Sequence, residues 1–343
     1  MPYLELDDII FNIQKFGGVT TYWRELTSRL STFVPGEIIH GTGNKLMRVY
    51  SPKSSAKVFH SSHFRVTSSH GVKNVTTIYD LIYEKNMARG RGRLLNLYER
   101  KKSVKYADAI VCISESTRRD FYEYYGNLIG SKPVHVIHLG CNFSPLMSLG
   151  QESLFERSDL IKMRLGEGQF FLYVGGRAGY KNFDLLLQAF VAGNFSSQGF
   201  SLICTGAAFN DDELEQIKNL KLEKAIFSIG LVDEAILGGL YSVARALVYP
   251  SIYEGFGLPP LEAMAMGCPV ICANASSLPE VVGTSGILVD PYSVEELADA
   301  MSTVLLESVR AKFSKAGVER AQAFDWNESA ARHANVYESL APF

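Results

Sequence analysis

Two glutamates, Glu254 and Glu262, stand eight positions apart within residues 251–270, SIYEGFGLPPLEAMAMGCPV. An apolar, strand-like run ends just before the first of them. The turn at 255–257 is rich in glycine, and the prolines that follow suit the first turn of a helix, which we expect over 259–265. The two carboxylates are therefore expected on either side of a strand-to-helix turn with exposed backbone.

This arrangement favours binding of a hydroxylated anion. The helix would present free N–H groups and the positive end of its dipole to a diphosphate. Glu254 can accept hydrogen bonds from sugar hydroxyls, and Glu262 can accept both hydroxyls of a ribose. The sequence thus predicts a nucleotide-sugar site; the alternative is that both glutamates are carboxylates on a solvated helix face.

A second group of residues, 175–182 (GGRAGYKN), follows an apolar strand-like run. It places Arg177 and Lys181 four positions apart beside flexible backbone that includes Gly176. A guanidinium and an ammonium aimed at one point can neutralise a departing diphosphate without a metal. The alternatives are a surface pair or a loose match to a dinucleotide-binding glycine loop, although the Gly-x-Gly-x-x-Gly order is missing.

The first half of the chain offers residues for an acceptor. Gly17 and Gly18 precede a helical segment and let backbone N–H groups approach a phosphate or an acceptor. Further polar side chains end two predicted strands and could contact a hydroxylated acceptor or, for the aspartate, assist at the anomeric centre: His60, His63, Tyr79 and Asp80. A metal site at the two histidines lacks a third ligand, and the chain has no Asp-x-Asp, so no metal is expected.

Charge divides the chain into unlike halves. Residues 1–140 hold 20 Lys and Arg against 12 Asp and Glu, whereas 141–343 hold 14 against 24. The densest basic run, Arg89 to Lys105, alternates with leucines and a tyrosine, as in a helix lying on an anionic membrane; a solvated helix packed on the sheet is the alternative. No apolar run is long enough to span a bilayer, the first residues are acidic, and the five cysteines form no Cys-x-x-Cys pair, so we expect a cytoplasmic protein.

Strand-like and helix-like segments alternate throughout, which predicts an α/β fold with two successive doubly wound, Rossmann-like domains. We expect ligands in a cleft between them. The predicted parts are an N-terminal domain over 1–140, a linker over 141–168, a C-terminal domain over 169–325 and a last helix over 326–343.

The motifs together resemble the family 4 glycosyltransferases, in particular bacterial mannosyltransferase-type enzymes of surface-polysaccharide assembly. The resemblance is strongest over residues 170–290. It is carried by FGGV at 16–19, CISES at 112–116, VIHLG at 136–140, VGGRAGYKN at 174–182, YPSIYEGFGLPPLEAM at 249–264 and LPEVV at 278–282.

The resemblance implies a GT-B fold whose C-terminal domain binds the donor and whose last helix crosses back to the N-terminal domain. It implies retaining, metal-independent transfer of a hexose, with mannose from GDP-mannose as first choice, to a glycan or lipid-linked acceptor. The residues implied to hold the donor are Gly17, Gly18, Gly176, Arg177, Lys181, Glu254, Gly255, Phe256, Gly257, Leu258 and Glu262.

One position departs from the family pattern, because Tyr79-Asp80 stands where many relatives have His-Asp. A tyrosine can donate a hydrogen bond but cannot carry imidazole chemistry near neutral pH. Two other functions stay open at this point. One is another GT-B activity, such as a nucleotide-sugar epimerase or a phosphorylase, and the other is a catalytically silent scaffold that binds a sugar nucleotide.

Overall fold

The chain forms two compact units in a computed structural model. The first comprises Met1–Gly140 and Phe324–Phe343, and the second comprises Cys141–Ala323. The predicted linker lies outside the described residues from position 144 to 168. The residues that the structure describes are 1–41, 43, 45–88, 90, 92–143, 169–177 and 179–342.

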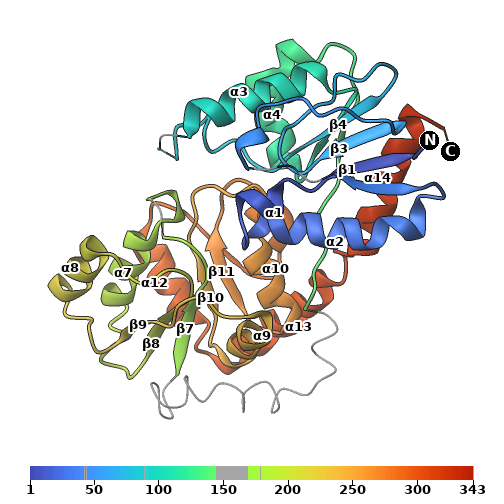
Figure 1. Ribbon diagram of the computed structural model, residues 1–343. Helices are drawn as coiled ribbons and strands as arrows, with labels where there is room; N and C mark the ends of the chain where they lie inside the picture. The colour runs from blue at the N-terminus through green and yellow to red at the C-terminus, as the bar shows by residue number, and fades with distance from the viewer. Residues whose placement is uncertain are drawn as a thin grey trace. The chain divides into compact units, whose positions relative to one another are not determined.

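A six-stranded parallel sheet in the order β2-β1-β3-β4-β5-β6 forms the centre of the first unit. Helices lie on both of its faces (Figure 1). The last helix, α14, packs along α2 within this unit. The bounds are β1 Leu4–Asp7, α1 Ile10–Ile13, α2 Gly18–Phe33, β2 Ile38–Gly41, η1 Lys45–Met47, β3 Val58–Ser61, β4 Lys73–Ile78, α3 Arg93–Tyr106, β5 Ala109–Cys112, α4 Glu115–Ile129, β6 Val134–Val136 and α14 Trp326–Leu340.

The second unit repeats the plan with the order β12-β11-β10-β7-β8-β9, again parallel throughout. Chain order reverses between β7 and β10, which makes this pair the switch point of a doubly wound sheet. The bounds are β7 Phe170–Tyr173, η3 Gly179–Lys181, α7 Phe183–Ala192, β8 Ser201–Cys204, α8 Asp211–Asn219, β9 Ile226–Ser228, α9 Glu234–Val243, β10 Leu247–Tyr249, α10 Leu258–Ala265, β11 Val270–Ala273, α11 Leu278–Val282, β12 Ile287–Val289, α12 Val294–Thr303 and α13 Glu307–Ala321.

The predicted α/β class with two doubly wound units is confirmed. Central strands such as β7, β10 and β11 are buried at every position, because helices cover both faces of the sheet. Residues 4–11 look like a single strand in the sequence, but the strand ends at Asp7 and the short helix α1 follows.

A chain of hydrogen bonds crosses the core of the first unit and ties α14 to the sheet. His333 Nδ1 lies 2.7 Å from the Ser329 carbonyl, which can only accept, so Nδ1 carries the proton. Its Nε2 then accepts from the Tyr22 hydroxyl at 2.7 Å. Tyr22 must in turn receive the Thr77 hydroxyl proton, at 3.2 Å.

The donors and acceptors at the other end of this series of hydrogen bonds follow in the same way. With its proton donated to Tyr22, Thr77 accepts from His60 Nε2–H at 2.9 Å. His60 Nδ1 therefore accepts from the Tyr337 hydroxyl at 2.7 Å. Burial lowers the pKa of both histidines, which keeps them neutral and fits this single direction of donation.

Thr77 connects the two ends of this series of hydrogen bonds, because it contacts both Tyr22 and His60. Loss of its hydroxyl should destabilise the first unit. Thr77→Val keeps the side-chain shape but leaves the His60 Nε2–H without its acceptor and Tyr22 without its donor. We expect the free energy of unfolding to fall by about 1 to 3 kcal/mol. Urea denaturation followed by tryptophan fluorescence measures this, because both tryptophans, Trp23 and Trp326, belong to the first unit.

The neighbouring Thr76→Val is the matched control. Thr76 is also buried on β4, but its hydroxyl has no hydrogen-bond partner among the described residues. Its replacement should leave stability unchanged or slightly higher. Equal losses in the two variants would contradict the role given to the hydrogen-bond chain.

Candidate functional site

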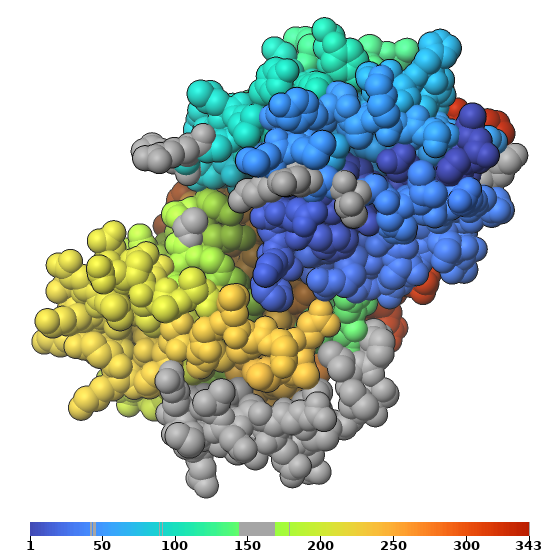
Figure 2. Space-filling model, viewed as in Figure 1, coloured from blue at the N-terminus to red at the C-terminus, as the bar shows by residue number. Residues whose placement is uncertain are grey.

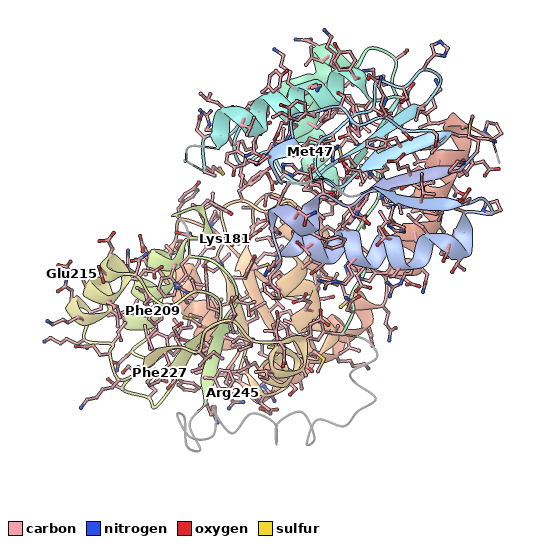
Figure 3. The ribbon with its side chains drawn as sticks, in the orientation of Figure 1. Met47, Lys181, Phe209, Glu215, Phe227 and Arg245 are labelled. Carbon is pink, nitrogen blue, oxygen red and sulfur yellow. The ribbon has the colours of Figure 1, made fainter. Side chains whose placement is uncertain are left out.

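An ion pair occupies the carboxyl edge of the second sheet at its switch point. Lys181, labelled in Figure 3, follows β7, and Glu254 follows β10. The Lys181 Nζ lies 2.6 Å from Glu254 Oε1 and 3.3 Å from the Tyr249 hydroxyl. The two charged side chains are 17% and 12% exposed. A ligand can therefore reach both, and the sequence-predicted ammonium and first carboxylate lie together.

The second carboxylate lies on α10, as predicted. The Tyr241 hydroxyl, from α9, donates to Glu262 Oε2 at 3.0 Å. Burial raises the pKa of Glu262 to about 7, the Tyr241 hydrogen bond opposes that rise, and the nearby Glu234 adds to it. Glu262 is thus a carboxyl group that gains or loses its proton near neutral pH.

A glycine turn joins the two carboxylates. Gly257 caps α10 with a φ of +116°, a conformation that residues with a side chain rarely adopt. A Cβ there would also lie 2.9 Å from Leu278 Cδ2, so the Leu278 side chain would have to shift. Pro259 and Pro260 occupy the first turn of the helix that begins at Leu258. Gly255 and Phe256 complete the predicted turn, with the Phe256 side chain buried.

Arg177 is held differently from the sequence-based expectation. Its Nε donates to Glu213 Oε1 at 2.9 Å, and one Nη donates to the carbonyls of Ala207 and Ala208. The guanidinium also lies 4.8 Å from the centre of the Phe209 ring, labelled in Figure 3. Because the side chain is only 3% exposed, a diphosphate could reach it only after these hydrogen bonds are broken. Lys181 is the more accessible of the two predicted cations.

Backbone and hydroxyl contacts hold the loops around this pair. The Gly176 carbonyl accepts from the Tyr173 hydroxyl at 2.8 Å. Ser276 and Ser277, before α11, hydrogen-bond the main chain of the 254–256 turn. Sequence reasoning missed Tyr241, Tyr249 and this serine pair. The available signal was the position of Tyr249 at the last residue of a strand that leads into the site.

Two residues expected at the acceptor lie in the core of the first unit. His60 is fully buried, and both of its ring nitrogens are used in the hydrogen-bond chain described above. Tyr79 is 7% exposed and donates to the Ser62 carbonyl at 3.1 Å. The structure does not place either side chain where an acceptor could contact it.

The other first-unit candidates lie nearer the surface. His63 Nε2 is 3.0 Å from an Arg48 nitrogen and 3.6 Å from Glu99 Oε2. Asp80, 31% exposed, lies 3.6 Å from Arg100. Gly17, with a φ of +133°, and Gly18 are exposed at the start of α2. Of the four acceptor candidates, only His63 and Asp80 have partly exposed side chains that a ligand could contact.

Across the described residues, no group of three or more His, Cys, Asp or Glu side chains could hold a metal ion. None of the five cysteines, all of which the structure describes, forms a disulfide, and four of them are buried.

Comparison with known proteins places the second unit in a family. The family model "Glycosyl transferases group 1" matches residues 161–320, which contain both carboxylates and both cations. The chain is 38% identical over 189 residues to "O-antigen chain mannosyltransferase B" of Escherichia coli. That match covers 53% of this chain and 49% of the relative, so the chain spans about half the length of this curated relative.

Solved structures match over both units. Sucrose-phosphate synthase from Thermosynechococcus elongatus has a TM-score of 0.73 at 20% identity and covers 99% of each chain. The Anabaena protein Alr3699/HepE, in complex with UDP and glucose, has a TM-score of 0.74 at 15% identity and covers 99% of this chain and 100% of its own. At such identities the likeness establishes the fold alone, and it confirms the GT-B expectation. The second unit thus contains a domain of the family "Glycosyl transferases group 1".

Proposed function

We propose that this protein is a retaining, metal-independent glycosyltransferase. It moves a hexose from a nucleoside diphosphate sugar to a hydroxyl of a glycan or lipid-linked acceptor. The observation that carries the proposal is the Lys181–Glu254 pair at the switch point of the matched domain, with Glu262 on the adjoining helix. A cation and two carboxylates there suit a diphosphate, a sugar and a ribose.

The proposed donor is GDP-mannose. Its support is the resemblance of this chain to a protein described as an O-antigen chain mannosyltransferase. Glu254 would hold hydroxyls of the sugar, and Glu262 would accept both hydroxyls of the ribose. Gly176 and the turn from Gly255 to Leu258 would line the sugar and phosphates.

In the proposed reaction the bond between the anomeric carbon and the diphosphate oxygen breaks, and the acceptor oxygen bonds to the same face of that carbon. The acceptor proton passes to the leaving diphosphate. Charge on that diphosphate is met by the Lys181 ammonium and by the positive end of the α10 dipole. Arg177 would add a second cation if Glu213 released it, and Asp80 is proposed on the acceptor side.

We also propose contact with an anionic membrane at its inner, cytoplasmic face. Leu94, Tyr98, Lys101 and Lys105 recur at helical spacing on α3 and are all exposed. Figure 2 shows the teal part of the first unit, which contains α3, at the surface of the face in view. Arg100 does not take part, since it is buried against Glu84, and Arg89 lies outside the described residues. No described helix is long and apolar enough to cross a bilayer.

Removing the accessible cation tests the proposed chemistry. Lys181→Ala should lower turnover by about 10²-fold or more, as expected when one preorganised charge contact to the transition state is lost. The measurement is nucleoside diphosphate release from GDP-mannose, UDP-glucose and ADP-glucose with mannose-terminated acceptors. Lys218→Ala, an exposed change on α8, is the control. Wild-type turnover in the Lys181 variant would refute the assignment.

The raised pKa of Glu262 predicts how nucleotide affinity changes with pH. Ribose hydroxyls donate to an ionised carboxylate, so binding should favour loss of the Glu262 proton. Affinity for GDP should therefore rise as the pH increases through the Glu262 pKa of about 7. Calorimetry between about pH 5 and about pH 8 measures it. Glu262→Gln should bind more weakly and lose this component; an unchanged pH profile would exclude the ribose role.

Charge reversal on α3 tests the membrane contact. The double variant Lys101→Glu/Lys105→Glu should weaken co-sedimentation with vesicles containing phosphatidylglycerol by about tenfold or more, since each basic residue near such a surface contributes about 1 kcal/mol. The control is Lys312→Glu/Lys315→Glu on α13, where both lysines are also exposed. Binding that is indifferent to anionic lipid and to salt would count against this surface.

A further inference from the structure

Three large apolar side chains are exposed within a turn of the first unit, residues 46–50, which begins on η1. Leu46, Met47 and Tyr50 are 81%, 47% and 64% exposed. Met47 is labelled in Figure 3. Single exposed apolar residues are common on protein surfaces, whereas a group of them typically marks a surface that contacts another molecule.

Hydrogen bonds hold this turn in place. The Tyr50 N–H donates to the Met47 carbonyl at 3.0 Å. The Tyr50 carbonyl accepts from Nε of the buried Arg65 at 3.3 Å. Arg48 donates to both carboxylate oxygens of Glu99 on α3, at 2.8 and 2.6 Å. A fixed backbone therefore presents the exposed side chains.

The 46–50 turn lies beside the exposed stripe of α3. Arg48 also donates to Asn96 Oδ1 at 3.2 Å, and Lys102 Nζ donates to the Val49 carbonyl at 3.2 Å. Lys102 directly follows Lys101, which belongs to the exposed stripe. The turn and the stripe are thus neighbours on the surface of the first unit.

The sequence around this surface carries little negative charge. Between Ile38 and Tyr79 there is no Asp or Glu, whereas Lys and Arg occur six times. Glu99 is the only acidic residue of α3, and it is buried and paired with Arg48. Neither segment therefore offers an exposed carboxylate that would repel an anionic surface.

Exposed apolar side chains beside exposed lysines fit the boundary of an anionic bilayer. Lysines attract the anionic headgroups over about one Debye length, and apolar side chains enter the adjoining acyl region. One weak signal gives only marginal membrane binding, and stable contact takes two. The α3 lysines supply one such signal, and the 46–50 turn can supply the other.

We propose that the 46–50 turn inserts its apolar side chains into the headgroup boundary of an anionic bilayer, beside the lysines of α3. This inference rests on the proposed membrane contact and deepens it. The turn adds buried apolar area that charge reversal on α3 does not remove. The inference is independent of the reaction proposed for the second unit.

Removal of two apolar side chains tests the inference. Leu46→Ser/Met47→Ser should lower partitioning onto vesicles of phosphatidylglycerol and phosphatidylcholine by about tenfold or more, since less apolar area leaves water. In about 1 M salt, where the screening length is about 3 Å, the wild-type protein should keep measurable binding that this variant lacks. The matched control is Leu231→Ser/Leu306→Ser in the second unit, where both leucines are exposed.

A tryptophan placed on the turn reports contact with the acyl chains. The two native tryptophans, Trp23 and Trp326, are buried. Fluorescence of the Met47→Trp variant should shift to shorter wavelength on the same vesicles and be quenched by phosphatidylglycerol with brominated acyl chains. The emission added by Leu231→Trp in the second unit should show neither change.

The outcomes separate this inference from the membrane contact itself. Wild-type vesicle binding by Leu46→Ser/Met47→Ser, or no quenching in Met47→Trp, would overturn the inference, while weaker binding by Lys101→Glu/Lys105→Glu would leave the contact of α3 standing. Absence of vesicle binding by the wild-type protein would overturn both. A dimer that forms in place of vesicle binding, and that Leu46→Ser/Met47→Ser abolishes in sedimentation velocity, would assign the turn to a second copy and overturn the inference.

Discussion

Opposite charges on Lys181 and Glu254 meet where the order of strands reverses, and the second unit is arranged to bring them there. The two residues are 73 positions apart, and the parallel pairing of β7 with β10 makes them neighbours. In this pair each charged side chain is the partner of the other, and a ligand group of the same charge can take the place of either. A diphosphate can replace the carboxylate beside Lys181, and a sugar hydroxyl can replace the ammonium beside Glu254.

The two carboxylates of the site have different surroundings, which suits them to different tasks. Glu254 is paired with a cation, whereas Glu262 has a phenol as its partner and a pKa raised to about 7. A charged, oriented carboxylate fits hydroxyls of the sugar. A carboxyl group that ionises near neutral pH fits a ribose, because hydrogen bonds from the two ribose hydroxyls stabilise its ionised form. The buried Tyr241 on the neighbouring helix α9 supplies the hydrogen bond to Glu262.

Much of the fold could be predicted from the sequence, because buried parallel strands are continuous apolar runs. The helix that carries Glu262 was predictable from its prolines and from Gly267, which has a φ of +71°. Two elements gave too weak a signal. β2 is a short edge strand and only partly buried. α13 packs through the small residues Gly317 and Ala321, so it lacks an apolar stripe.

The site was predictable in its charges but not in their pairing. Spacing alone could not show that Glu213 would pair with Arg177, or that Tyr241 would hydrogen-bond Glu262, since these contacts join separate elements. His60 was misjudged for a related reason. A histidine at the end of a strand can face a ligand or the core, and here Thr77 and Tyr337 hold it in the core.

The role of the Lys181–Glu254 pair is tested by a crystal structure of the protein with the donor it binds most tightly among GDP-mannose, UDP-glucose and ADP-glucose. We expect a phosphate oxygen on Lys181 Nζ, a sugar hydroxyl on Glu254 and an opened ion pair. A diphosphate bound elsewhere, with Lys181 and Glu254 still in contact, would contradict it.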